Sequence, residues 1–304
     1  MRLAGPYQKH FSCTCLMVIF QILNLLGLAS FSFANEPDFS LKLNASVYAP
    51  GDVVWCSFSS PLPVGSATLV WKKDRIPLAY FEESELFGAF FAIPHNEEPG
   101  EEELGVEFLQ ENGTRGRRKL IFKIVSKEFP VQRLTLPKEK VSLSKQNLER
   151  HLREKAVIKQ ALGNLLDSRV WQQSFQRPVK GETSTPFGVR RVLNGEPRSS
   201  HSGIDLRGVL GEPVAASSDG IVLLTGDHFF AGKSVYVDHG MGLVTMYFHL
   251  SRIEVNPGER VRAGQTIGLL GSTGRSTGAH LHWGLRVHNR PADPLSLLNL
   301  FPLP

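Results

Sequence analysis

The sequence predicts a mainly β protein built from a small N-terminal β-sandwich-like module, a helical connector and a larger C-terminal antiparallel β-sheet domain. Short apolar or alternating runs, separated by glycine and proline turns, occupy residues 39–128 and 177–304. Such runs are typical of strands. Between them, residues 144–171 carry apolar side chains at three- and four-residue spacing, which indicates an amphipathic helix or a pair of helices.

Bulk composition limits the classes to consider. The chain has 304 residues, of which 41% are hydrophobic and 21% charged, and its formal net charge is +5. These values are ordinary for a globular protein that is long enough for more than one domain. No nucleic-acid-binding motif is present in the sequence, so we expect no nucleic-acid partner.

The N-terminus has the pattern of a secretory signal peptide. Arg2 and Lys9 precede an apolar run over residues 16–28, and small residues end at Ala34. We therefore expect residues 1–34 to direct export and to be cleaved. The alternative is an uncleaved anchor, which the shortness of the run disfavours. The sequence predicts contact with a membrane only through this segment.

Cysteine usage excludes two kinds of site. Cys13 and Cys15 lie in the predicted signal segment, which leaves Cys56 without an internal disulfide partner after cleavage. The sequence thus contains neither a disulfide framework nor a cysteine-rich zinc finger. Because Cys56 follows Trp55 in an apolar run, we interpret it as a small buried hydrophobe rather than a nucleophile.

Residues 35–130 are predicted to form the β-sandwich-like module. Apolar or alternating runs cover residues 53–58, 67–71, 105–109 and 120–125, with turn signals such as Asn112-Gly113 between them. Several short strands at this spacing favour an immunoglobulin-like sandwich. No cluster of chemically active side chains occurs in this region, so we expect a structural or binding role.

Residues 131–175 are predicted to be the helical connector. Ser144 is a suitable N-cap, and the apolar spacing continues towards Trp171, with a break expected near Gly163-Asn164. The simplest role is a connector packed on one domain. The alternative is that residues 39–171 regulate the C-terminal domain, for example as a lid or inhibitory arm.

Residues 176–304 are predicted to form an antiparallel sheet. Glycines separate the strand candidates and no long helix intervenes, which argues against parallel β-α-β winding. The candidates are residues 213–216, 220–224, 234–238, 242–248, 260–261, 265–270 and 280–287.

This C-terminal region carries four histidines and one aspartate that together suggest a metal site. In a strand, side chains alternate between faces, so His280 and His282 point the same way, about 7 Å apart. His201 and Asp205 also have an even spacing. Three nitrogen or carboxylate ligands, with a fourth coordination position left open, suit a catalytic zinc ion. His201, Asp205 and one histidine of the 280/282 pair could supply the ligands, while His249 and the other histidine could handle protons.

Two familiar motifs are absent. The sequence contains no His-Glu-x-x-His helix, which excludes the common helical zinc-protease arrangement. The glycine-rich run over residues 268–278 lacks the Gly-Lys-Ser/Thr ending of a phosphate-binding loop.

Residues 177–300 resemble the catalytic domain of the lysostaphin-type zinc metalloendopeptidases, which cut peptides of bacterial peptidoglycan. The resemblance lies in the order and identity of several runs. They are Phe187-Gly-Val-Arg-Arg191, His201-Ser-Gly-Ile-Asp205, residues 213–220, Val237-Asp-His-Gly240, Tyr247-Phe-His-Leu-Ser251 and residues 271–282 with Asp293-Pro294 behind them.

This resemblance implies specific roles. His201, Asp205 and His282 would bind one Zn²⁺ per chain, and His249 and His280 would be the catalytic pair. It implies an exported endopeptidase, periplasmic or associated with the cell envelope, that hydrolyses peptidoglycan cross-links. The alternative is a non-catalytic, wall-binding activator of peptidoglycan amidases, because some relatives have lost ligands. This chain has a matching residue at all five positions, which favours an enzyme.

Overall fold

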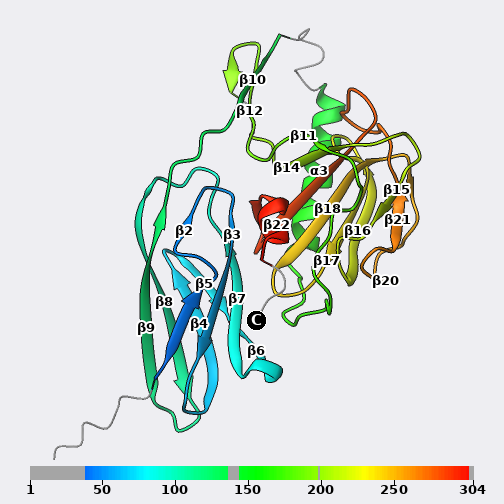
Figure 1. Cartoon of the computed structure of the whole chain (residues 1–304). Coiled ribbons are helices and arrows are strands. Elements are labelled where there is room, and N and C mark those ends of the chain that lie inside the picture. The colour runs from blue at the N-terminus through cyan, green and yellow to red at the C-terminus, as the bar shows by residue number, and fades with distance from the viewer. Residues whose placement is uncertain (1–37, 136–143, 198, 301–304) are drawn as a thin grey trace, which may run out of the picture. The chain divides into compact units, whose positions relative to one another are not determined.

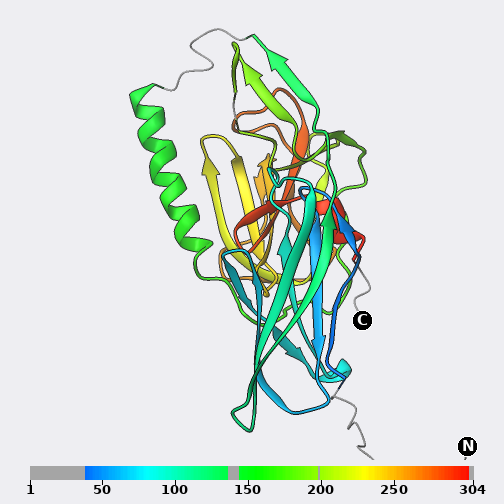
Figure 2. The ribbon, with the colours of Figure 1, turned by 90° about the vertical axis from the view of Figure 1, so that its left-hand side faces the viewer.

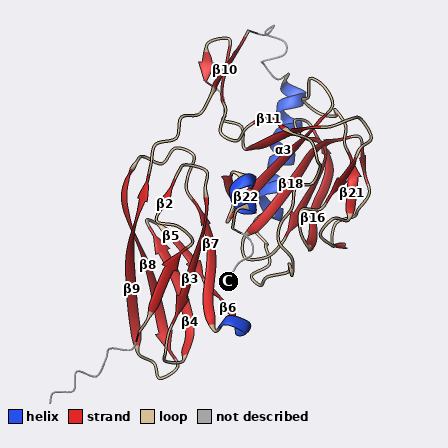
Figure 3. Ribbon diagram, in the orientation of Figure 1, coloured by secondary structure: helices blue, strands red, loops and turns tan. Residues whose placement is uncertain are grey.

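The structure is a computed structural model that describes residues 38–135, 144–197 and 199–300. The predicted signal peptide at residues 1–34 lies outside these residues. Within the described ranges, neither α-helix has the length and apolar character needed to cross a membrane. The fold is mainly β, as predicted, and Figure 3 shows how few helical segments accompany the strands.

The N-terminal module consists of two sheets that enclose one apolar core (Figure 1). Strand β4 (Val64–Trp71) alternates as expected: Ala67, Leu69 and Trp71 are buried, and the residues between them are more exposed. One sheet has the order β1 (Ser40–Leu43), β3 (Val53–Ser59), β7 (Leu86–Ala92) and β6 (Ala79–Phe81), and the 3-10 helix η1 (Glu82–Ser84) follows β6. The other has the order β2 (Val47–Tyr48), β9 (Arg115–Ile124), β8 (Gly100–Gln110), β4 (Val64–Trp71) and β5 (Asp74–Pro77).

The connector is partly helical. Strand β10 (Val131–Leu134) pairs in parallel with β12 (Arg190–Leu193), which also pairs with β13 (Glu196–Pro197). Helix α3 (Lys145–Ala161) begins at Ser144, whose hydroxyl accepts a hydrogen bond from the Asn147 amide. The helix ends at Ala161 and the chain turns at Gly163, which agrees with the predicted break near Gly163-Asn164. The prediction that helix continues beyond this break to Trp171 is wrong, because residues 164–171 are not helical. Trp171 is instead buried in non-helical chain.

The C-terminal region is built on one large antiparallel sheet, and a small sheet completes it. The large sheet has the order β11 (Thr183–Thr185), β14 (Gly203–Arg207), β22 (His280–Val287), β18 (Leu243–Leu250), β17 (Gly232–Asp238), β16 (Gly220–His228) and β20 (Arg260–Val261), with β23 (Arg290–Ala292) paired to β22. The small sheet has the order β15 (Pro213–Ala215), β21 (Thr266–Leu269) and β19 (Arg252–Ile253). Helix α4 (Pro294–Leu298) follows β23.

An apolar cluster joins the sandwich to the C-terminal region. Trp55 and Phe90 of the sandwich pack in one cluster with Trp171 and with Leu285 of β22. Polar contacts accompany this cluster, since Arg290 pairs with Asp74 at 2.7 Å. Residues 39–304 accordingly form one compact unit.

Candidate metal centre

Strands β14 and β22 place three of the five predicted residues on one face of the large sheet. Asp205 lies directly opposite His282 in the antiparallel register. The neighbouring residues Ile204 and Leu281 are fully buried in the apolar core. Because side chains alternate along a strand, Asp205, His280 and His282 point away from that core, into the site.

The site also depends on a close approach of backbone. A Cβ atom at Gly203 would lie 2.4 Å from the Trp283 carbonyl oxygen and 2.9 Å from Nε2 of His282. A residue with a side chain therefore cannot occupy this position without moving the strand that carries His282. This explains the glycine two residues before Asp205.

His201 precedes β14 and is fixed by the loop that leads to it. Its amide donates to the Val189 carbonyl, and its carbonyl accepts from the Gly188 amide, both at 2.9 Å. Its ring Nδ1 lies 2.9 Å from the Pro186 carbonyl oxygen. A carbonyl only accepts hydrogen bonds, so Nδ1 carries the proton and Nε2 turns towards Asp205.

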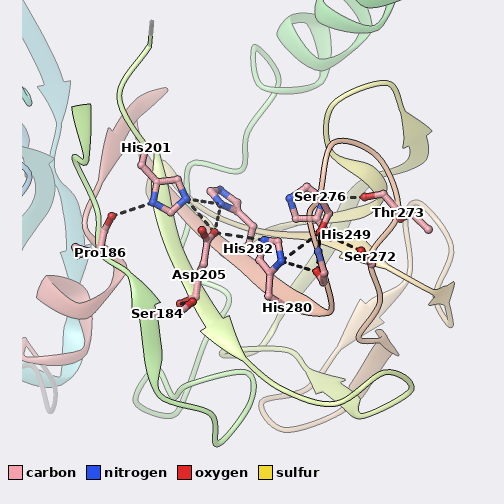
Figure 4. A network of polar contacts seen from close by, with 11 residues as sticks. Ser184, Pro186, His201, Asp205, His249, Ser272, Thr273, Ser276, His280 and His282 are labelled. Atoms are coloured by element: carbon pink, nitrogen blue, oxygen red, sulfur yellow. Dashed lines mark hydrogen bonds and ion pairs between the residues drawn. The ribbon is translucent and has the colours of Figure 1, made fainter. Parts of the chain in front are cut away.

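The three ligand candidates converge on one point (Figure 4). Oδ1 of Asp205 is 3.0 Å from both Nε2 of His201 and Nδ1 of His282. The two ring nitrogens are 2.9 Å apart. A carboxylate oxygen and a ring nitrogen at this distance need a proton or a cation between them. A metal ion displaces such protons when it binds.

The donor set fits zinc. Two imidazole nitrogens and a carboxylate are the ligands of many catalytic zinc sites, with bonds of about 2.0–2.2 Å and a fourth position left for water or substrate. Among the described residues, this is the one group of histidine, cysteine and acidic side chains positioned to hold a metal ion. The predicted zinc site therefore has suitable donors in suitable positions.

Electrostatics favour the charge states that a metal requires. Burial alone would raise the pKa of Asp205, but its hydrogen bonds and charge interactions with His201 and His282 hold that pKa below its usual range. Burial lowers the pKa of His282, against the opposing effect of Asp205. The aspartate is thus anionic and His282 is readily neutral, as ligands must be.

His249 and His280 lie beside this triad (Figure 4), and their ring centres are 4.8 Å apart. The Nδ1 of His249 lies 2.8 Å from the Thr273 carbonyl oxygen. The Nδ1 of His280 lies 2.9 Å from the Gly278 carbonyl oxygen. Both Nδ1 atoms therefore donate, which leaves each Nε2 unprotonated in the neutral ring. Nε2 of His280 is 3.8 Å from Oδ1 of Asp205.

Burial is the main reason that the pKa of His249 falls to about 4. The charges of His280 and His282 lower it further, and the hydrogen bond to the Thr273 carbonyl opposes the shift. His249 is therefore neutral near pH 7, and its Nε2 can accept a proton.

Two contributors to the site escaped the sequence reasoning. Phe248 lies opposite His282 in the register, and their rings stack with centres 5.2 Å apart. Thr273 acts through its carbonyl oxygen. The glycine-rich run contains Thr273, but no residue type marks a backbone acceptor. Alternation along a strand would place Phe248 on the opposite face from His249, so spacing did not mark it either.

Two other histidines of the C-terminal region, His239 and His228, have structural surroundings. His239 is fully buried between the Asp219 carbonyl and the Thr245 hydroxyl, at 2.7 Å from each. His228 is buried and contacts the Ser234 hydroxyl at 2.7 Å.

Comparison with known proteins identifies this region. Residues 199–294 match peptidase family M23. A segment of 128 residues, 41% of the chain, is 44% identical to the peptidoglycan DD-endopeptidase ShyA of Vibrio cholerae serotype O1 and spans 30% of that protein. A segment of 135 residues, 43% of the chain, is 41% identical to the DD-carboxypeptidase/endopeptidase Mpg of Neisseria meningitidis serogroup B and spans 31% of it. Both matches thus cover less than a third of the relative's own length.

The likeness in fold extends further along the chain. A crystal structure from Pseudomonas aeruginosa assigned to peptidase M23 covers 85% of this chain and 97% of its own, with a TM-score of 0.64 and 29% sequence identity. The predicted resemblance and the predicted antiparallel architecture are confirmed. Residues 199–294 of this chain thus match peptidase family M23, within a fold similar to that of a structure assigned to the same family.

Proposed function

We propose that this protein is an exported zinc endopeptidase that hydrolyses peptide cross-links of bacterial peptidoglycan. One observation carries the proposal: two imidazole nitrogens and one carboxylate oxygen meet within 3.0 Å of one another beside one face of the large sheet. The relatives named above are peptidoglycan DD-endopeptidases or carboxypeptidases, which supports a D,D cross-link as the substrate.

We assign the residues the following roles. His201, Asp205 and His282 hold the metal. A bound zinc ion lowers the pKa of a water molecule and polarises the substrate carbonyl. His249 takes a proton from the attacking water, since burial keeps its ring neutral. His280 donates a hydrogen bond to the developing oxyanion or transfers a proton to the leaving amine.

The Nδ1 contacts of the catalytic pair support these roles. Each ring is oriented by a backbone carbonyl, so that the other nitrogen faces the space beside the triad. A carbonyl acceptor fixes one tautomer of a neutral histidine. Both catalytic side chains are thus oriented before substrate binds, which lowers the entropic cost of reaction.

Mass spectrometry of fragments released from defined peptidoglycan tests the proposal. We expect zinc-loaded mature protein to release monomeric muropeptides from D,D-cross-linked dimers, and a chelator to abolish the release. A glycine-bridged substrate is the matched comparison, and its preferential cleavage would reassign the bond. Intact dimers after prolonged incubation with zinc-loaded protein would refute the endopeptidase.

The runner-up is a non-catalytic activator of peptidoglycan amidases. It requires wall binding without hydrolysis and without sensitivity to chelators. This chain has all three metal-ligand candidates and the two histidines beside them. That set argues against an activator, because activation by wall binding requires neither a metal ion nor a proton-transfer group. The fragment assay above distinguishes the two functions.

Export and regulation belong to the proposal as well. N-terminal sequencing of protein recovered from the cell envelope tests the predicted cleavage, and a mature chain that starts at Asn35 is expected. Regulation of the peptidase domain by residues 39–171 stays a prediction. Trp55 and Phe90 of the sandwich pack with Leu285 of β22. This packing connects the sandwich to the strand that also carries His280 and His282.

A further inference from the structure

His249 has an unusual backbone that its neighbours must hold in place. Its φ angle is +65°, in the left-handed region that a residue with a side chain occupies only at a cost in energy. Its amide donates to the Ala231 carbonyl, and its ring Nδ1 donates to the Thr273 carbonyl, both at 2.8 Å. The orientation of His249 therefore depends on two segments: the tip of the β16–β17 hairpin, residues 227–232, and the loop over residues 271–279.

These two segments are bonded to each other. The Arg275 amide donates to the Phe230 carbonyl at 3.0 Å, and the Arg275 guanidinium lies 4.1 Å from the centre of the Phe230 ring. The Lys233 amide donates to the Thr273 hydroxyl at 2.9 Å. A displacement of the hairpin tip would therefore move both hydrogen-bond acceptors of His249.

Helix α3 also contacts the hairpin tip. Oε2 of Glu154 accepts a hydrogen bond from the Phe229 amide at 2.8 Å. The guanidinium of Arg150 donates to the Asp227 carbonyl at 2.7 Å, and the His151 ring meets the Phe230 ring edge-on at 4.7 Å. Figure 2 shows the helix alongside the strands of this hairpin. The helix lies outside residues 199–294, which match the family.

The contact from Glu154 is a strong one. Burial alone would raise the pKa of Glu154, but the hydrogen bond from the Phe229 amide and the neighbouring Arg150 bring that pKa below its usual value. Glu154 is thus charged at neutral pH, and a hydrogen bond to a charged acceptor is about twice as strong as a neutral one. No residue of α3 itself is buried. Polar contacts of this kind are therefore important in holding the helix against the C-terminal domain.

We propose that helix α3 positions the catalytic His249 through the hairpin tip, with Glu154 as the positioning residue. This inference rests on the proposed function, because it takes His249 as the proton acceptor. It differs from the alternative role of a lid or inhibitory arm, which the sequence left open for this helix. Without the hydrogen bond between Glu154 and the Phe229 amide, the hairpin tip is held less firmly. The Ala231 carbonyl, which accepts from the His249 amide, then moves more freely, and His249 leaves its productive orientation.

The test compares Glu154→Ala with Glu149→Ala in the full chain. Glu149 is an exposed glutamate on the same helix, so its variant controls for lost charge and helix propensity. For Glu154→Ala we expect faster hydrogen exchange at the His249 amide, unchanged exchange at the His282 amide and unchanged zinc content. We expect kcat on a defined muropeptide dimer to fall about tenfold with little change in KM.

A conservative variant separates positioning from general destabilisation. Glu154→Gln keeps an oxygen acceptor for the Phe229 amide, so it is expected to restore most of the protection at His249 and most of kcat. The Glu149→Ala variant should match the wild type in both measurements.

Two results would overturn the inference. One is wild-type exchange at the His249 amide in Glu154→Ala, and the other is a rise in kcat for that variant. The exchange measurement needs no catalysis. If the wild-type protein cleaves no peptidoglycan, the proposed function fails, while the exchange data still decide whether α3 holds His249.

Discussion

Asp205 and His282 face each other across strands β14 and β22, with Oδ1 of the aspartate 3.0 Å from Nδ1 of the histidine. Neither side chain reaches the other through a flexible loop, because both stand on neighbouring strands of one sheet. Buried residues on either side of each, such as Leu206 and Trp283, anchor these strands in the core. These two proposed metal ligands are thus preorganised by the same register that builds the fold.

Replacement of Asp205 by asparagine should abolish metal binding. The change keeps the shape of the side chain and removes the negative charge that balances the metal. We expect zinc per chain, measured by mass spectrometry after dialysis, to fall from about one towards zero. His201→Ala should behave in the same way. A full complement of zinc in Asp205→Asn would contradict the ligand assignment.

Replacement of His249 or His280 by alanine should remove activity and leave the metal in place. Neither residue belongs to the group of three converging donors. Loss of a proton-transfer group costs about 10²- to 10⁴-fold in rate, so we expect kcat to fall in this range at unchanged zinc content. Loss of zinc from either variant would instead mark that histidine as a ligand.

The sequence predicted those strands of the sandwich that a run of apolar or alternating residues marks clearly. The run at residues 53–58 and the alternating run at residues 67–71 lie within β3 and β4. Strand β7 was missed, although it is buried on both faces as β3 is, for example through Phe91 against the sandwich core and Phe90 against Trp171. A strand of this kind has no alternation, and its second contact depends on distant residues.

For the site, the sequence predicted which side chains share a face but not the backbone contacts around them. Even spacing placed His280 and His282 on one face, and the structure has both side chains there. Which of the two belongs to the triad came from the family resemblance, since spacing treats them alike. The contribution of Thr273 is a backbone carbonyl, and the pairing of β10 with β12 joins segments far apart in the sequence. Neither is encoded in a local pattern.

Arg207 should contribute to recognition of a substrate carboxylate. It lies directly opposite His280 in the register and two residues after Asp205, so its side chain starts from the face that carries the site. It is exposed, and its guanidinium forms no hydrogen bond or ion pair with any residue in the described ranges. Peptides cross-linked through diaminopimelate carry free carboxylates, which a guanidinium binds well.

For Arg207→Ala we expect KM on such a peptide to rise about ten- to a hundredfold, the value of a charge-assisted hydrogen bond. The same peptide with an amidated carboxylate should be affected far less, and Arg207→Lys should retain part of the preference. An equal rise in KM for both peptides would show that Arg207 does not bind the carboxylate.

His239 should make the stability of the fold depend on pH. Its ring is fully buried, and burial lowers its pKa to about 4, against the opposing hydrogen bond to the Asp219 carbonyl. In the unfolded chain its pKa is about 6.5. Between these values the unfolded state binds a proton that the folded state excludes. This contribution to stability is therefore fully present above about pH 6.5 and is lost as the pH falls towards 4.

The expected slope is about 1.4 kcal/mol per pH unit across this window. Denaturant unfolding of the wild type and of His239→Gln, measured between pH 4 and 7, isolates the effect, because other titrating groups are common to both. Glutamine keeps a donor for Asp219 and an acceptor for the Thr245 hydroxyl, which limits the loss of packing. The free energy of unfolding of the variant should fall less steeply as the pH is lowered. Parallel curves for the two proteins would mean that His239 titrates alike in the folded and unfolded states.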